Sequence, residues 1–270
     1  MKKPLRLGLV VEGNATSSSI LRMPSLAQEL GPIKSRGLPL ARRISNSLRA
    51  GYAITEYQDL QAARLILLRV PDPVAPRIVE ELCGSPLPFE ALAFVLCETW
   101  LPTGTLEPLR ERGSAVASLV APAASRGDCF IAEGDISAVR HIRRFLKTAE
   151  AQTVELKAGT KPLYFAAELL IRALPIPLLS AAQHAMRGSG ISGNQLSALL
   201  EEMARDMFDT FSKGPHVTWG GPLTECSSET ADIHLTQLAD HDPDLAGMVT
   251  EQLEWARNRL RRNRAHRHSS

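Results

Sequence analysis

Short apolar runs alternate with amphipathic helical patterns through the first 156 residues, and this alternation constrains the fold more than any other feature. The strongest runs occupy 5–11, 64–70, 92–97 and 115–120. Each run is long enough for one strand, and helical spacing separates one run from the next. Strands that alternate with helices predict a parallel sheet covered by helices on both faces. Such a sheet binds its ligands at the carboxyl ends of its strands.

The pattern changes at Lys161, after which it is helical throughout. Before that point, a helix is expected from about residue 18, in which Pro24 predicts a kink or a second start. We therefore predict an α/β domain over 1–157 and an all-α domain with a basic C-terminal tail over 158–270. Weaker strands are expected at 32–35, 52–55, 128–133 and 153–156, and helices at 38–49, 78–83 and 136–148.

Composition describes an ordinary soluble protein. Six arginines lie in 257–270, so the net charge of +2 comes from the tail, and the rest of the chain is mildly acidic. Nothing indicates a nucleic-acid surface on the folded part. The apolar run 163–182 is interrupted by charges and prolines, so we expect no membrane span and a cytoplasmic protein. We expect no metal site, and reduced, mostly buried thiols at Cys83, Cys97, Cys129 and Cys226.

The turn after the first run carries part of a dinucleotide-binding signature. A G-x-G-x-x-G motif would place glycines where this chain has Val11, Gly13 and Thr16. Only Gly13 remains, at the position where a side chain would collide with a pyrophosphate. The alternative is an ordinary strand-to-helix turn in a fold that binds no nucleotide. The amides that would point from a helix N-terminus toward the anion belong to Asn14, Ala15, Thr16 and Ser17.

The residues after the second predicted strand favour NADP over NAD. NAD binders place an acid there to hold the ribose hydroxyls, whereas NADP binders use an arginine. No acid occurs between Glu29 and Glu56. The side chains of Ser35 and Arg36 would instead contact the 2′-phosphate. The alternative is a solvated basic helix.

Four short motifs follow one another in an order that resembles a known family. They are Val70-Pro71-Asp72, Lys161-x-x-Tyr164-x-Ala166-Ala167, Gly220-Gly221-Pro222-Leu223 and His234. In their order and spacing the chain resembles Rossmann-like proteins that carry the C-terminal domain of unknown function 2520. These are distant relatives of pyrroline-5-carboxylate reductase and the 6-phosphogluconate dehydrogenase superfamily. The resemblance implies a dinucleotide site that includes Val70, Pro71 and Asp72, and a homodimer formed through the helical half.

The chain also departs from the family pattern. Phe165 stands where the family has a histidine after the tyrosine, and Ala121-Pro122 stands where it has His-Pro. Two imidazoles that could serve as acid or base are therefore absent. Thr99-Trp100 replaces a Ser-Gly, and Trp100 would crowd the crevice.

Lys161 and Tyr164 are the candidate catalytic residues. They lie one helical turn apart, so both can project from one helix face. The related reductases use a lysine here to protonate or polarise the substrate oxygen, and the Tyr164 hydroxyl could donate to the same oxygen. The alternative is a structural junction in which Tyr164 packs between domains. The candidate substrate contacts, at a strand end, are Glu98, Thr99 and Trp100.

These features support two hypotheses of different classes. The first is an NADP-dependent oxidoreductase that acts on a small carbonyl or imine substrate. The second is a non-catalytic, degenerate Rossmann-like dimer that binds a nucleotide or another protein. In either case, the helical half has more apolar positions than so few helices can enclose, which predicts a homodimer with Lys161 near the interface side of each crevice.

Overall fold

The computed structural model describes residues 7–13, 18–122, 129–213 and 226–267 of the 270-residue chain. It divides into two compact units, Met1–Leu169 and Leu170–Ser270, and each is described by itself. The division falls after the first helix of the helical half, whereas the sequence placed it before Lys161.

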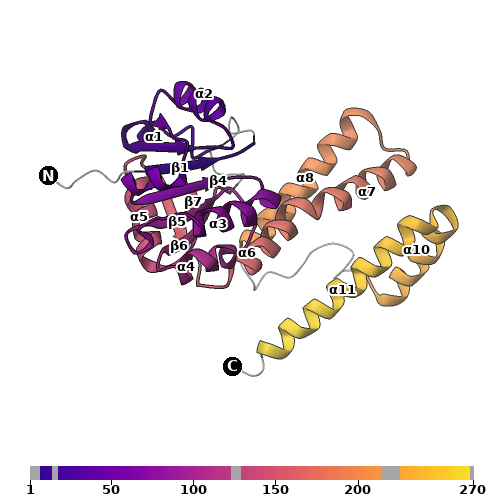
Figure 1. Ribbon diagram of the computed structural model, residues 1–270. Coiled ribbons are helices and arrows are strands. Elements are labelled where there is room, and N and C mark those ends of the chain that lie inside the picture. The colour runs from indigo at the N-terminus through magenta and orange to yellow at the C-terminus, as the bar shows by residue number, and fades with distance from the viewer. Residues whose placement is uncertain (1–6, 14–17, 123–128, 214–225, 268–270) are drawn as a thin grey trace. The chain divides into compact units, whose positions relative to one another are not determined.

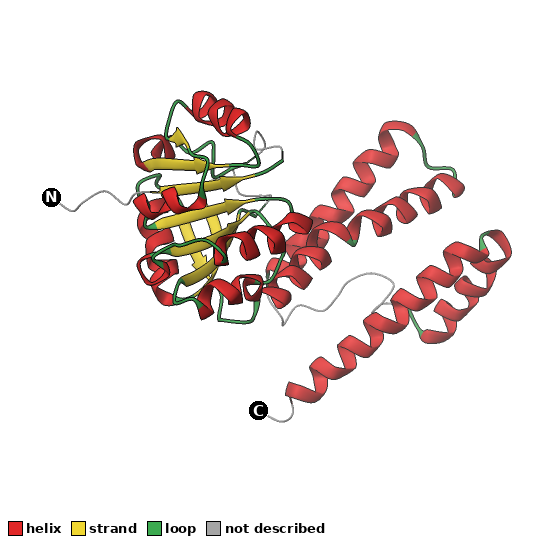
Figure 2. Ribbon diagram, viewed as in Figure 1, coloured by secondary structure: helices red, strands yellow, loops and turns green. Residues whose placement is uncertain are grey.

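The first unit contains one eight-stranded sheet in the order β3-β2-β1-β4-β5-β6-β7-β8 (Figure 2). Neighbouring strands are parallel except for β6 and β7. The sheet is therefore mostly parallel, as predicted. The strands are β1 Leu7–Val11, β2 Leu30–Lys34, β3 Tyr52–Ala53, β4 Leu65–Arg69, β5 Ala93–Cys97, β6 Ala115–Val120, β7 Cys129–Gly134 and β8 Gln152–Glu155.

Helices cover both faces of this sheet (Figure 1). Along β4, Leu65 and Leu67 join one buried cluster with α2 and α5, while Ile66 and Leu68 join a second cluster with α3 and α4. Successive strand residues point to opposite faces, so a strand buried on both sides has a continuous apolar run. The helices of this unit are α1 Pro24–Glu29, α2 Leu38–Leu48, α3 Ala75–Cys83, α4 Glu107–Glu111, α5 Ile136–Lys147 and α6 Lys161–Glu168.

One strand runs against the predicted direction. The segment that joins β6 to β7, 121–128, is eight residues long, and a parallel crossover needs a dozen or more. β7 therefore returns antiparallel to β6. Gly134 ends β7 with φ +149°, and a Cβ there would lie 2.3 Å from the Val116 carbonyl oxygen. Only glycine fits so close to the neighbouring strand.

Two further predictions were wrong in detail. The first helix begins at Pro24 rather than near residue 18, because 18–22 form turns and proline suits the first helical position. Pro24, where a kink or a second start was expected, is therefore where the first helix begins. The four cysteines are free, but only Cys97 is buried, since the other three lie nearer the surface.

The described residues of the second unit form helices joined by turns and loops, with no strand among them, as predicted. Its elements are the π-helical turn Leu169–Ala173, which begins in the first unit, and the helices α7 Pro175–Gly188, α8 Gly193–Ser212, α10 Ser228–His241 and α11 Pro243–Arg267. The helices α10 and α11 pack against each other. The turn stands just before Pro175, which lacks the amide that a regular helix would use.

Many apolar side chains of the helical half are exposed. The continuous helical run Lys161–Gly188 is, among the described residues, the one segment long and apolar enough to cross a membrane, judged by length and composition only. None of its most apolar stretch is buried. Our expectation that it spans no membrane stays a prediction.

Candidate active site

The carboxyl ends of β1, β4 and β5 form the edge of the sheet where the sequence predicted a ligand. Gly13 follows β1 with φ +75°, and a Cβ there would lie 3.1 Å from the Pro71 ring. The turn therefore requires a glycine both for its backbone conformation and for its closeness to Pro71. The predicted pyrophosphate contacts at 14–17 lie outside the described residues.

Asp72 and Thr99 are brought together at this edge. The Thr99 hydroxyl donates to the Asp72 carboxylate at 2.5 Å, and it accepts the amide of Leu101 at 3.0 Å. These bonds join the loop after β4 to the loop after β5. Thr99 is buried, so its hydroxyl holds the two loops rather than presenting an open contact.

The end of β2 lies at the other side of the predicted cofactor site. Ser35 is buried, and its hydroxyl donates to the Gly37 carbonyl at 3.1 Å. Lys34 donates to the Ser35 carbonyl at 3.0 Å, and its ammonium lies 4.9 Å from the Tyr57 ring centroid. Arg36 is exposed. Of the two residues predicted to hold a 2′-phosphate, Arg36 is the one whose side chain is open to a ligand.

Glu98 has a different environment from the strand-end substrate contact that was expected. Its carboxylate accepts the amides of Ser19 at 2.5 Å and Ile20 at 3.3 Å, and it pairs with the Arg69 Nε at 2.7 Å. Its backbone has φ +55°, the left-handed region that few residues other than glycine adopt. The side chain thus links the ends of β4 and β5 to the turn before α1.

Lys161 is the most buried charged side chain of the candidate site. It is 2% exposed, and its ammonium donates to the carbonyls of Thr99 at 3.0 Å and Leu101 at 2.6 Å. Burial lowers the pKa of Lys161 to about 8, against the opposing effect of the nearby carboxylates of Glu133 and Asp72. An amine with this pKa exchanges its proton close to neutral pH, which suits acid–base chemistry.

Glu133 completes this cluster and was not among the predicted site residues. It lies on β7, is almost fully buried, and accepts the Lys161 backbone amide at 3.0 Å. Its second oxygen accepts the Thr103 hydroxyl, which in turn lies 2.9 Å from the Ser118 hydroxyl. The carboxylate thus caps the first turn of α6, where its charge is favourable. An acid ending a strand that is otherwise apolar was the sequence signal for it.

Three aromatic side chains contact one another on α6 and on the loop whose carbonyls accept the Lys161 ammonium. The Trp100 ring stacks on Tyr164 with centroids 6.2 Å apart, and it contacts Phe165 at 5.3 Å. Trp100 remains 42% exposed. The Tyr164 hydroxyl donates to the Glu168 carboxylate at 2.5 Å, one helical turn further on. The predicted pair therefore shares a helix, but the two polar groups bond to different partners. Their catalytic role stays a prediction.

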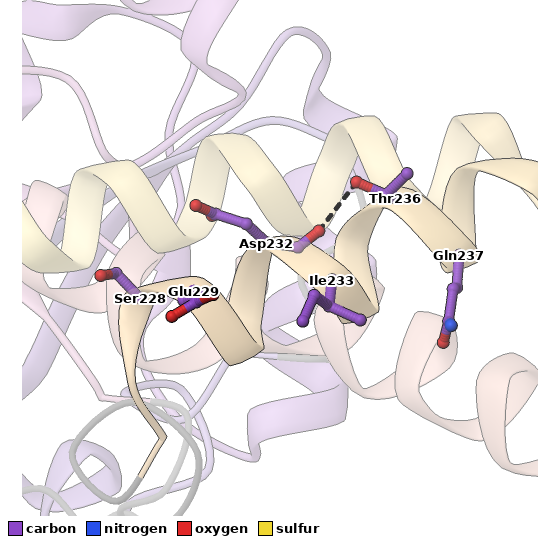
Figure 3. Close-up of a pocket in the computed structure, with 6 residues that line it drawn as sticks. All are labelled: Ser228, Glu229, Asp232, Ile233, Thr236 and Gln237. Carbon is purple, nitrogen blue, oxygen red and sulfur yellow. Dashed lines mark hydrogen bonds between the residues drawn. The ribbon is translucent and has the colours of Figure 1, made fainter.

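The other sequence candidates lie elsewhere. His234 is exposed on α10, and the predicted turn at 220–223 lies outside the described residues. A shallow depression of about 540 Å³ lies along α10 and is lined by Ser228, Glu229, Asp232, Ile233, Thr236 and Gln237 (Figure 3). None of the predicted site residues lines it. Within the described ranges, no group of three or more metal-ligating side chains comes together.

Comparison with known families extends the pattern of motifs. Residues 128–250 match the family model described as Domain of unknown function (DUF2520). The chain therefore carries this domain, which confirms the resemblance seen in its motifs. The match begins at β7, so it covers the end of the sheet as well as most of the helical half. A search of curated proteins found no match.

Solved structures show the same fold over almost the whole chain. Protein TM1727 from Thermotoga maritima is 14% identical with a TM-score of 0.67, and the alignment covers 96% of this chain and 99% of that one. A reductive aminase from Aspergillus terreus, in complex with NADPH and ethyl-5-oxohexanoate, is 13% identical with a TM-score of 0.66 and 95% coverage of both chains. A pyrroline-5-carboxylate reductase from Coxiella burnetii is 11% identical with a TM-score of 0.52, covering 95% of this chain and 98% of that one. The chain is thus distantly similar in structure to NAD(P)-dependent oxidoreductases.

Proposed function

We propose that this chain is an NADP-dependent oxidoreductase that reduces a small carbonyl or imine, with Lys161 as the proton donor. The observation that carries the proposal is the buried Lys161 ammonium, whose pKa is lowered to about 8 beside an exposed aromatic surface. Enzymes place acid–base groups where burial moves their pKa toward neutral pH. The fold is one that binds dinucleotides in structures such as the reductive aminase.

The geometry around Lys161 suits donation of one proton. An ammonium has three N–H groups, and the carbonyls of Thr99 and Leu101 accept two of them. The third proton can pass to a substrate oxygen or nitrogen as negative charge develops there. The neutral amine that results keeps two N–H groups, so both carbonyl bonds survive the transfer. The lysine is therefore held in place in both protonation states.

Trp100 and Tyr164 would form the wall against which the substrate packs. Stacked rings exclude water and give an apolar face for a small organic molecule. Because the Tyr164 hydroxyl proton is bonded to Glu168, we expect the substrate to contact the ring of Tyr164 rather than to accept its hydroxyl proton.

The described residues fit NADP at its adenosine end. Arg36 is exposed after β2, and no acid lies there to hold an unphosphorylated ribose. Gly13 lets the backbone approach a ligand at the end of β1. When bound, the cofactor supplies the hydride, and the protein supplies the proton and the binding surface.

Calorimetric titration with NADPH and NADH tests the cofactor. We expect NADPH to bind more tightly, and Arg36→Ala to weaken NADPH by about 1–3 kcal/mol, the range for a charge-assisted hydrogen bond. NADH binding should change little, because it lacks the phosphate. Equal affinity for both cofactors would remove Arg36 from the site.

Turnover tests the lysine. With NADPH and a panel of small cyclic imines and aldehydes, Lys161→Met should lose at least a hundredfold in kcat while still binding NADPH. Lys157→Met is the matched control, since Lys157 is exposed on the loop before α6, and it should keep wild-type turnover. If both variants turn over alike, Lys161 is not the proton donor.

The second candidate function is a non-catalytic nucleotide-binding or interacting dimer. The contacts of Lys161 also suit a structural role, because its ammonium is bonded to two backbone carbonyls and is almost fully buried. This candidate predicts NADPH binding, or none, without turnover of any member of the panel.

We further infer that the protein is a homodimer formed through its helical half. The exposed apolar side chains of α7 and α8 include Ile176, Leu178, Met203, Met207 and Phe208. Soluble monomers rarely leave contiguous apolar surface of this extent in water. A twofold dimer covers such a face with its own copy, and the scattered charges on these helices, such as Arg187 and Glu201, suit a protein partner better than lipid.

A further inference from the structure

The Glu98 carboxylate lies among donors of the kind that bind phosphate. Two backbone amides, of Ser19 and Ile20, and the guanidinium of Arg69 point at its two oxygens. Successive amides in a turn form an anion-binding concavity, and a guanidinium adds a charge-assisted bond. The side chain is only 12% exposed, so these bonds form largely away from water.

The donors are held in place independently of Glu98. The Ser18 hydroxyl accepts the Leu21 amide at 3.1 Å, and Ser18, Ile20 and Leu21 are all buried. The Ile20 and Leu21 side chains belong to the apolar cluster that fills one face of the sheet. Packing and the serine turn thus fix the direction of the Ser19 and Ile20 amides. The Glu98 carboxylate, which is at the end of a side chain, can move away from these amides, whereas the amides themselves are fixed.

The backbone of Glu98 shows that its position is imposed. A left-handed conformation costs a residue other than glycine free energy, and it persists only where the surroundings over-determine it. Here the Glu98 amide donates to the Leu119 carbonyl at 2.8 Å, so the main chain is anchored while the side chain turns toward the Ser19 amide.

The same edge of the sheet carries a second carboxylate, Glu12, which does not bond to these amides. Glu12 follows β1 and pairs with Arg77, which is half-exposed on α3. No described contact links Glu12 to the Ser19 or Ile20 amides. A phosphate that approaches this edge meets both charges, but only Glu98 holds the donors that the phosphate needs.

We propose that the amides of Ser19 and Ile20 and the guanidinium of Arg69 form an anion site that the chain's own Glu98 fills. A phosphate group of a ligand enters this site only by displacing the carboxylate. The ligand class is a phosphate or diphosphate ester, and for the dinucleotide this rests on the proposed function. Glu98 therefore lowers the affinity for the phosphates of the cofactor, because its carboxylate must leave the site before they bind.

The test measures binding of inorganic pyrophosphate and of NADPH by calorimetry, together with the shift in Tm that each produces. Glu98→Asn removes the charge, shortens the side chain and tolerates the left-handed backbone. Glu98→Gln removes only the charge and keeps the length of the side chain, so it is the variant that should disturb folding less. We expect both variants to bind pyrophosphate at least tenfold more tightly than wild type, and pyrophosphate to raise their Tm more than that of wild type.

Glu12→Gln is the matched control. It removes the same charge from the same edge without opening the amides, so it should gain threefold or less. A gain equal to that of the Glu98 variants would overturn the proposal, because general repulsion would then explain it. Wild-type affinity in both Glu98 variants would also overturn it.

Comparing pyrophosphate binding with NADPH binding separates this inference from the proposed function. Tighter pyrophosphate with no NADPH binding in any variant would uphold the anion site and reject the NADP enzyme. Tight NADPH binding in wild type that the Glu98 variants weaken would uphold the enzyme and reject the self-filled site.

Discussion

The two units of the molecule satisfy their apolar side chains in opposite ways. The first buries strand residues on both faces of its sheet, and Phe94, Phe130 and Phe145 are completely enclosed. Among described side chains of the second, only Leu196 and Ala246 are buried core residues, while Phe211 is 82% exposed. The first unit is filled by its own sequence. The second leaves apolar side chains exposed, and our proposed homodimer would cover them. The same kind of apolar pattern therefore forms a core in one unit and an exposed surface in the other.

The largest expected difference between the two units is in the stability cost of removing a phenylalanine side chain. Phe130→Ala empties a fully buried site and should cost about 3–5 kcal/mol of unfolding free energy. Phe208→Ala, at an exposed site on α8, should cost about 0.5 kcal/mol or less in dilute protein. Urea unfolding measures both. If Phe208→Ala is equally costly at every concentration, the second unit encloses that side chain by itself.

The buried lysine adds a charge to the otherwise apolar first unit. Its pKa is about 8 when folded and 10.5 when unfolded, so between these values the unfolded chain binds more protons. Stability at this site therefore rises with pH from about 8 to about 10.5, and the cost of burying the charge is fully present below pH 8. Relative to Lys161→Met, wild type should gain up to about 3 kcal/mol across that window. Parallel pH curves for the two proteins would contradict the lowered pKa.

A charged substitution on the exposed face of α7 tests whether a homodimer covers the second unit. Leu178→Asp on α7 should weaken the homodimer about a hundredfold, roughly 2.7 kcal/mol, because an unpaired carboxylate would be buried at the interface. Light scattering at micromolar concentration would then give the monomer mass. Ser180→Asp adds the same charge to a polar position of that helix and is the control. A monomeric wild type, or one that co-floats with lipid vesicles, would reject the dimer.

The regular parts of the fold could be predicted from sequence. The runs at 64–70 and 92–97 became β4 and β5 almost to the residue, because strands buried on both faces have continuous apolar sequence. The direction of β7 was missed, since direction depends on the length of a connection rather than on the strand itself. The start of α1 was also missed, because buried apolar residues at 20 and 21 resemble a helix face and lie instead in a turn.

The candidate site was predicted only where one residue could be judged by itself. Gly13 and Lys161 carry signals in their own position, a turn glycine and a lysine that opens a helical half. Glu133 carries only the weak signal of an acid in an otherwise apolar strand, and Arg69 carries none, because their roles come from partners 28 and 29 residues away, Lys161 and Glu98. Long-range polar pairs of this kind depend on how strands are ordered in the sheet. Periodicity in the sequence does not report that order.

The strand order has a consequence for how the chain assembles as it is synthesised. From β4 to β8 every strand lies beside its successor in the sequence, so these pairings close in order as the chain lengthens. The pairing of β1 with β4 is different, because it joins Leu7 to Leu65 across two intervening strands. Until 65–69 emerge from the ribosome, one side of β1 has no neighbour and its amides and carbonyls stay open to other chains. The first three strands are therefore the part of this protein that depends most on protection during translation.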